Sequence, residues 1–204
     1  MFSGPVTYPG TAVNKHRPAS ARPAATGPWV IDTRDVGRRP GVSRHYQRSA
    51  QVEAEFGFDP VVLVTRGSTI EFAVLAESVV EGVLLTGTAT TPISGECSRC
   101  LDPWSDTLEI SFSELFAYPD SATEETTDSD EVFRLVDDLV DLEPVVRDAI
   151  VFALPQAPLC TPDCAGLCPR CGGRWADLGP NHEHETIDAR WAVLKDRFGG
   201  DGEG

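Results

Sequence analysis

The sequence predicts an α+β fold: an antiparallel β-sheet that could be barrel-like, a long covering helix, a C-terminal Cys/His knuckle and a short last helix. Three observations support this prediction. Short β-branched runs follow one another without helical segments between them, which is typical of antiparallel neighbours. A stripe of apolar residues with helical period comes next along the chain. Four of the six cysteines then fall within residues 160–171.

The length and composition fit one domain with a tail. The chain has 204 residues, of which 41% are hydrophobic, so it can bury a core. Residues 1–28 are rich in Pro, Ala, Gly, Ser and Thr and show no periodicity, which predicts a disordered tail. Residues 29–200 are expected to form a single domain. Its expected parts are 29–118, mainly β, an acidic loop 119–140, a helix 141–155, the knuckle 156–186 and a helix 187–198.

Four predicted strands account for the β part of the domain. They are the β-branched runs 61–64, 70–75 and 79–88, and the segment 108–112, which alternates apolar and polar residues. The Arg-rich segment 29–49 is punctuated by Gly37, Pro40 and Gly41, and we interpret it as irregular. The acidic segment that follows the strands is expected to be a solvated loop over its first half.

The predicted covering helix carries its apolar residues on one stripe. Asp141 can cap its start, Pro144 suits its first turn and Pro155 stops it. A second helix is predicted from Asp188 to Phe198, where two glycines follow. The stripe of the covering helix consists of Leu142, Val145, Val146, Ala149, Ile150, Ala153 and Leu154.

The charge is unevenly distributed along the chain. Lys and Arg number 17 against 32 Asp and Glu, and the net charge of −15 excludes a uniformly basic nucleic-acid binder. Residues 1–50 nevertheless carry eight of the basic residues and only two of the acidic ones. No apolar run reaches the roughly 18 residues of a membrane span, and the start lacks the apolar stretch of a secretory signal. We therefore expect a cytoplasmic protein whose cysteines are reduced or bind metal.

Two C-x-x-C pairs and two histidines are the candidate metal ligands. Two residues between cysteines let a tight turn aim both thiolates at one ion, and tetrahedral Zn²⁺ takes four N or S ligands. The spacing therefore predicts a structural Zn²⁺ within residues 160–184. The candidate ligands are Cys160, Cys164, Cys168, Cys171, His182 and His184, with Cys97 and Cys100.

Three ligand sets are compatible with this spacing. The simplest is a local site of the four cysteines within 160–171. In the second, His182 or His184 replaces Cys160 or Cys164. In the third, the two C-x-x-C pairs share one ion across the fold and the other four candidates hold a second ion. The first C-x-x-C pair could instead be two small hydrophobic residues in a turn between strands.

The same residues do not match catalytic patterns. The first C-x-x-C pair is followed by Leu101-Asp-Pro103, which breaks a helix, whereas a thioredoxin-type pair opens one. The zinc deaminases place H-x-E before their P-C-x-x-C, whereas here the histidines follow the cysteines. His182 and His184 also lack the spacing of H-E-x-x-H. We therefore expect a closed structural zinc site and no enzymatic activity.

Five motifs occur in order along the chain. They are the start 29–41, the motif Gly95-Glu-Cys-Ser-Arg-Cys-Leu101, the helix 141–150 with its exit 153–160, the run Cys164–Gly172, and Asp188-Ala-Arg-Trp191. Together they cover about 30–200 and resemble the YceD-like family of bacteria and plastids, in its actinobacterial form. The resemblance implies a cytoplasmic role in ribosome biogenesis, through accumulation of 23S rRNA and without known catalysis. Many relatives have Cys-x-Cys where this chain has His182-x-His184, and imidazole can replace thiolate on zinc.

The expected partners are rRNA, ribosomal proteins or a ribonuclease, with no membrane and no small-molecule substrate. A second hypothesis is an acidic adaptor that holds a ribosomal protein or a ribonuclease, and a third is a thiol oxidoreductase or zinc hydrolase. Five arginines could contact rRNA phosphates or an acidic protein face, or could only form surface ion pairs with the acidic body. They are Arg34, Arg38, Arg39, Arg44 and Arg48.

Overall fold

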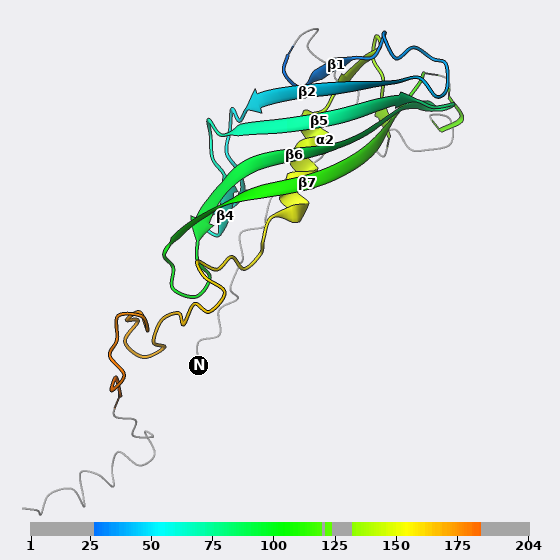
Figure 1. Cartoon of the computed structure of the whole chain (residues 1–204). Coiled ribbons are helices and arrows are strands. Elements are labelled where there is room, and N and C mark those ends of the chain that lie inside the picture. The colour runs from blue at the N-terminus through cyan, green and yellow to red at the C-terminus, as the bar shows by residue number, and fades with distance from the viewer. Residues whose placement is uncertain (1–26, 120, 124–131, 185–204) are drawn as a thin grey trace, which may run out of the picture.

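The structure is a computed structural model that describes residues 27–119, 121–123 and 132–184 (Figure 1). Within these ranges the chain forms mostly β-structure with one covering helix. The elements are β1 (Val30–Asp32), β2 (Ser43–Gln51), β3 (Phe56–Phe58), β4 (Val62–Val64), β5 (Thr69–Ser78), β6 (Gly82–Glu96), β7 (Pro103–Ala117), β8 (Phe133–Arg134), β9 (Leu139–Asp141) and α2 (Glu143–Ala153).

Seven strands form the main sheet. β2 pairs with β5, β5 with β6 and β6 with β7, all antiparallel. β4 pairs with the last residues of β6, past the part of β6 that pairs with β5. β3 pairs with β4, and β8 runs parallel to β7. β1 and β9 form a separate two-stranded sheet. No described strand joins β2 to the other end of the sheet, so the described strands form an open sheet and not a closed barrel.

The hairpin of β6 and β7 runs the length of the sheet. Each strand has 15 residues, and they pair from Gly82 with Ala117 to Glu96 with Pro103. A strand of this length spans roughly 50 Å. The turn at residues 97–102 therefore lies at the end of the sheet remote from β1, as Figure 1 shows.

The helix α2 lies across one face of the sheet and closes the main core (Figure 1). On the sheet side, the even-numbered residues of β5 from Ile70 to Ala76 are buried. On the helix side, Val146 and Ile150 are fully buried. The Asp141 carboxylate accepts a hydrogen bond from the Glu143 N–H at 3.0 Å at the start of the helix. Most residues of the apolar stripe are therefore buried against the sheet, as their helical period predicts.

The predicted fold class is confirmed, because the structure is a mostly antiparallel sheet with one helix and a Cys/His cluster near the C-terminus. The helix, however, has 11 residues and is short rather than long. Ala153 is its last residue and is exposed, so it does not contribute to the buried stripe. No helix in the described part of the chain is long and apolar enough to cross a membrane.

Two segments carry more regular structure than their composition suggests. The Arg-rich segment 29–49, interpreted as irregular, contains β1 and most of β2. β2 forms a strand because it pairs with β5 over nine residues, and this pairing outweighs the low β propensity of its polar residues. The interval 119–140 contains β8 and the start of β9. The predicted helix 187–198 and most of the predicted tail 1–28 lie outside the described residues.

Candidate metal centres

The turn of the β6–β7 hairpin forms the first C-x-x-C knuckle. The N–H of Leu101 donates to the Cys97 carbonyl at 2.9 Å, and the N–H of Cys97 donates to the Asp102 carbonyl at 2.8 Å. Leu101 adopts a positive φ of 62°, a conformation that favours glycine. The long ladder below the turn holds this knuckle at the end of the sheet.

The second C-x-x-C pair repeats the same local geometry, with one antiparallel bridge between Leu167 and Arg174 beneath it in place of a long hairpin. The N–H of Gly172 donates to the Cys168 carbonyl at 2.9 Å, and the N–H of Cys168 donates to the Gly173 carbonyl at 2.7 Å. Gly172 has a φ of 70°, so it occupies the position that Leu101 has in the first knuckle. Each knuckle thus presents two sulfurs on one side and needs two further ligands to complete a tetrahedron.

The first cluster consists of Cys97, Cys100, Cys160 and Cys164, whose sulfurs all lie within 4.8 Å of one another. The Sγ atoms of Cys97 and Cys164 are 3.7 Å apart, and those of Cys100 and Cys160 are 3.6 Å apart. With Zn–S bonds of about 2.3 Å, the edge of a tetrahedron is about 3.8 Å. The four thiols therefore have the spacing of a four-sulfur tetrahedral site, and all but Cys160 are buried.

The second cluster consists of Cys168, Cys171, His182 and His184, again with all ligand atoms within 4.8 Å of one another. The Sγ of Cys168 lies 3.2 Å from Nε2 of His184, and the Sγ of Cys171 lies 3.6 Å from Nε2 of His182. A tetrahedral ion with one sulfur and one nitrogen ligand separates these atoms by about 3.6 Å. Cys171 is exposed and the two histidines are half-buried, so this cluster is more open than the first.

The structure combines the eight candidate ligands differently from the three sets suggested by their spacing. It does not bring Cys160 and Cys164 into one cluster with the second C-x-x-C pair, as the local set requires. It also does not join the two C-x-x-C pairs. Instead both histidines complete the second pair, and the two earlier cysteines complete the first. Two similar knuckles that each lack two ligands indicate two sites, but the spacing does not show which pair of ligands completes which knuckle.

Backbone N–H groups point at the first sulfur of each knuckle. Those of Cys100 and Cys160 lower the pKa of the Cys97 thiol to about 6, against the opposing effect of burial. Those of Cys171 and Arg170 lower the pKa of the Cys168 thiol to about 6. Because the thiolate is the form that binds metal, the lowered pKa of these two thiols favours metal binding.

The other two buried thiols of the first cluster favour the protonated form. At Cys100 the Asp102 N–H lowers the pKa, but burial and the hydrogen bond to the Asp102 carboxylate outweigh it and raise the pKa. Burial raises the pKa of Cys164. Protons are therefore released from these two thiols when a metal ion binds.

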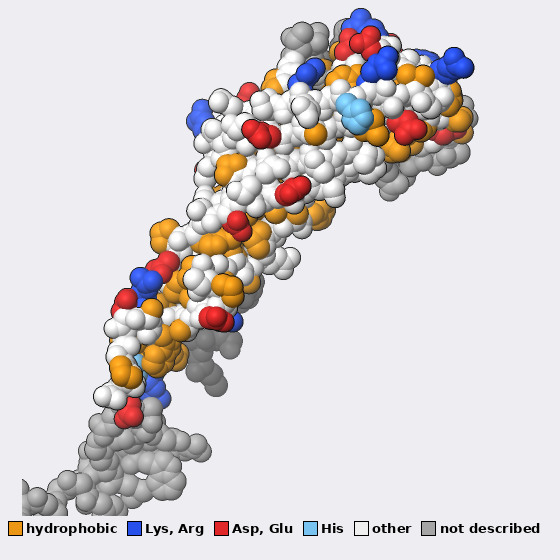
Figure 2. All heavy atoms as spheres, in the orientation of Figure 1, with side chains coloured by type: hydrophobic (Ala, Val, Ile, Leu, Met, Phe, Trp, Pro, Cys, Tyr) orange, Lys and Arg blue, Asp and Glu red, His pale blue; other side chains and the backbone are white. Residues whose placement is uncertain are grey.

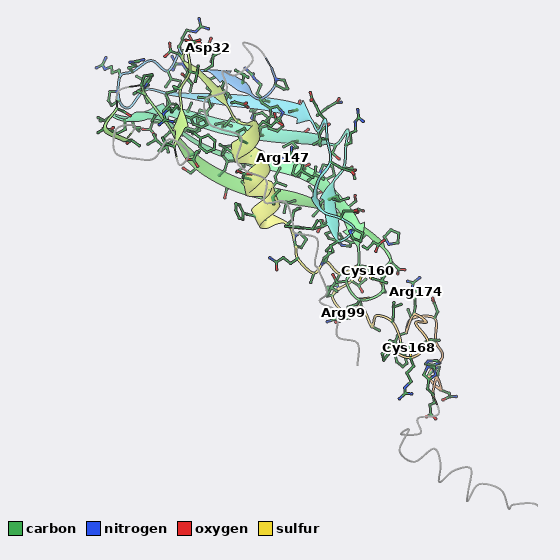
Figure 3. All side chains as sticks on the ribbon, turned by 180° about the vertical axis from the view of Figure 1, so that it is seen from behind. Asp32, Arg99, Arg147, Cys160, Cys168 and Arg174 are labelled. Carbon is green, nitrogen blue, oxygen red and sulfur yellow. The ribbon has the colours of Figure 1, made fainter. Side chains whose placement is uncertain are left out.

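Two polar contacts that were not predicted from the sequence order this end of the chain. Within the first cluster, the Arg99 guanidinium donates to the Cys164 carbonyl at 2.9 Å. Arg174, which follows the second knuckle, forms an ion pair with Asp102 of the first. Only three residues separate Cys164 from Cys168, and among them Gly166 has a φ of 78° and passes close to the Arg99 backbone. The clusters therefore form one continuous module (Figure 3).

The five arginines singled out from the sequence lie at the other end of the molecule, on and next to β1 and β2. Figure 3 shows Asp32 at this end and Cys160 and Cys168 at the opposite one. All five side chains are exposed, and Figure 2 shows basic side chains gathered there. Arg34 is the one that forms a described ion pair, at 2.6 Å from Asp32, which lowers the pKa of that carboxyl.

Comparisons with known proteins give one family. A family model described as "Large ribosomal RNA subunit accumulation protein YceD" matches residues 85–196. An uncharacterized protein of Mycobacterium tuberculosis (strain ATCC 25618 / H37Rv) is 44% identical over 185 residues, which is 91% of this chain and 88% of the relative. The uncharacterized protein YlbN of Bacillus subtilis (strain 168) is 30% identical over 108 residues, covering 50% of this chain and 61% of YlbN. No solved structure matches the chain.

Proposed function

The chain belongs to the YceD family, and we propose that it is a factor that supports the accumulation and maturation of 23S rRNA and of the large ribosomal subunit. The observation that carries this proposal is the match of the family model to residues 85–196, which include most of β6, all of β7 and α2, and both described clusters. We infer a cytoplasmic role without catalysis. Both clusters supply four protein ligands, which is the number that fills a structural zinc site.

We further propose that each cluster binds one Zn²⁺. Their donor sets, four thiols in one case and two thiols with two imidazoles in the other, are those of structural zinc sites. The ligand spacings given above agree with tetrahedral coordination. When bound, the ions replace a hydrophobic core as the main stabilisation of this end of the chain.

An acidic adaptor is the second candidate function. The net charge of −15 favours contact with basic proteins, such as a ribosomal protein, over contact with RNA. Capture of basic ribosomal proteins by the purified chain, at a salt concentration where rRNA fragments do not bind, would favour this candidate.

Depletion of the protein in its own organism tests the main proposal. We expect a lower ratio of 23S to 16S rRNA and a smaller 50S peak on a sucrose gradient, because only the large subunit depends on the proposed factor for its accumulation. Re-expression of the wild-type chain should restore both, and re-expression of the Cys97→Ser variant should not. An unchanged 23S-to-16S ratio after complete depletion would contradict the proposed function.

A further inference from the structure

The strand β2 is an open edge of the main sheet. It pairs with β5 along its whole length, and no other described strand pairs with it. All of its nine residues except Tyr46 and Ala50 are exposed. An open edge of this length is a template for the addition of another strand.

The register shows which backbone groups face the open side. The N–H of Val52 donates to the Ser68 carbonyl, and the N–H of Ser78 donates to the Val42 carbonyl. In an antiparallel ladder the hydrogen-bonded pairs alternate, so the even-numbered residues of β2 direct their backbone groups toward β5. The backbone groups of His45, Gln47 and Ser49 therefore face away from the sheet.

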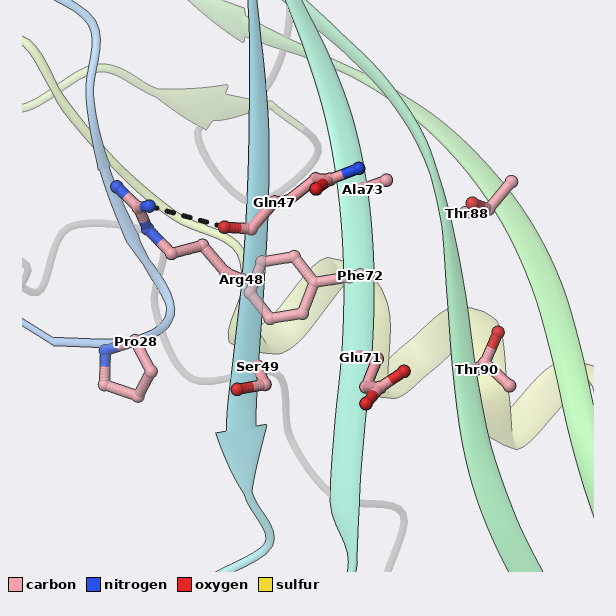
Figure 4. Close-up of a pocket in the computed structure, with 9 residues that line it drawn as sticks. All are labelled: Pro28, Gln47, Arg48, Ser49, Glu71, Phe72, Ala73, Thr88 and Thr90. Atoms are coloured by element: carbon pink, nitrogen blue, oxygen red, sulfur yellow. Dashed lines mark hydrogen bonds between the residues drawn. The ribbon is translucent and has the colours of Figure 1, made fainter.

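Two arginine side chains lie along this open side. The Arg44 guanidinium donates to the Ser43 carbonyl at 3.1 Å, and the Arg48 guanidinium donates to the Gln47 carbonyl at 3.4 Å. Figure 4 shows the Arg48 side chain on the side of β2 that faces away from β5. The two arginines are four residues apart on the same face of the strand, so they form two cationic points along the edge.

These charges are not neutralised within the described part of the chain. Arg38, Arg39, Arg44 and Arg48 form no ion pair with a described residue, in contrast to Arg34. The Arg48 guanidinium lies 6.0 Å from the Tyr46 ring centroid, within the range of a cation–π contact. The edge therefore combines backbone groups that face away from the sheet with cations that are held beside them.

The outer face of the sheet beside this edge leaves room for a ligand. A shallow hollow of about 680 Å³ lies there (Figure 4). Part of its lining consists of short or hydroxyl-bearing side chains, which leave space above the strands. The lining residues include Gln47, Ser49, Ala73, Thr88 and Thr90, with Glu71 as the acidic member.

We propose that the open edge of β2 binds an acidic, extended segment of a partner protein as an added β-strand. The backbone of this segment pairs with the outward backbone groups of His45, Gln47 and Ser49. Two of its carboxylates, four residues apart, accept hydrogen bonds from Arg44 and Arg48 in place of the Ser43 and Gln47 carbonyls. A single-stranded RNA fits the edge less well, because it has no alternating N–H and C=O groups and its phosphates would approach Glu71.

The test uses the purified full chain and a fluorescent peptide of alternating glutamate and valine, as long as β2. We expect binding in anisotropy titrations, and slower hydrogen exchange at His45, Gln47 and Ser49 when the peptide is bound. The double variant Arg44→Ala/Arg48→Ala should weaken binding about tenfold or more, since each lost pair is charge-assisted. The matched charge controls are Arg34→Ala and Arg66→Ala, the latter at an exposed arginine in the turn between β4 and β5. Each should change binding less than about twofold.

A second variant separates strand addition from charge attraction. Gln47→Pro removes an outward N–H but no N–H of the β2–β5 ladder, so it should weaken peptide binding about tenfold. The melting temperature of the variant shows whether its sheet is intact. Unchanged binding by this variant would overturn the proposal, as would no binding of the peptide at all. Equal or tighter binding of an oligouridylate would reassign the edge to RNA. None of these outcomes affects the rRNA ratio in cells, which tests the proposed function separately.

Discussion

Removal of the metal ions is expected to unfold the Cys/His end of the chain and to leave the sheet folded. The small core at this end consists of Cys97, Cys100 and Cys164, against which only Leu159 and Leu167 pack among the described residues. Such a core cannot offset the conformational entropy of ordering residues 156–184. Binding of a structural zinc supplies about 10–16 kcal/mol in zinc-finger peptides, which is enough to do so.

Hydrogen exchange with and without a strong zinc chelator measures this effect. In the chelated protein we expect exchange to become fast at 97–102 and 160–184. Peptides from the middle of β5 and β7 serve as the internal control, because they belong to the main core and should stay protected. Retained protection at 160–184 after complete loss of zinc would show that the ions do not hold this module together.

Replacement of Ile150 by alanine is expected to lower the free energy of unfolding by about 3 kcal/mol. Ile150 is a residue of α2 whose side chain is fully buried in the main core, so its truncation leaves a cavity there. Phe152 lies two residues further along the same helix and is 90% exposed, which makes Phe152→Ala the matched control. Its expected cost is within about 0.5 kcal/mol, because little buried area is lost.

Chemical denaturation followed by circular dichroism compares the two variants. The zinc content that we propose for the two clusters should be the same in both variants, since Ile150 lies in the main core and Phe152 is exposed. Equal destabilisation by the two substitutions would mean that α2 is not packed on the sheet as described.

The parts of the fold that follow from local pattern were predictable from the sequence. The stripe from Leu142 to Leu154 has helical period, and its buried members are those that face the sheet. The β-branched run at 61–64 contains β4, and the run at 70–75 lies in β5. In these segments the side chains that form the core also have the propensity for the element that they occupy.

The parts that depend on pairing between distant segments were not predictable in the same way. β2 has polar side chains at most positions, and it is a strand because β5 provides its ladder from Ser43 to Gln51. The cysteine quartets depend on the length of the β6–β7 hairpin, which carries Cys97 and Cys100 to the segment of Cys160 and Cys164. Spacing along the chain shows which residues can bind a metal, but not which of them meet.

The most direct test of the two-centre arrangement is the zinc content of the purified chain and of one variant at each centre. We predict two zinc ions per wild-type chain, and one each in Cys97→Ser and Cys168→Ser, because the clusters share no ligand. Substitution by cobalt should then leave a four-sulfur spectrum in Cys168→Ser and a mixed sulfur and nitrogen spectrum in Cys97→Ser. A single ion in the wild-type chain that both variants lose would contradict the account, since it would mean that the two C-x-x-C pairs share one site.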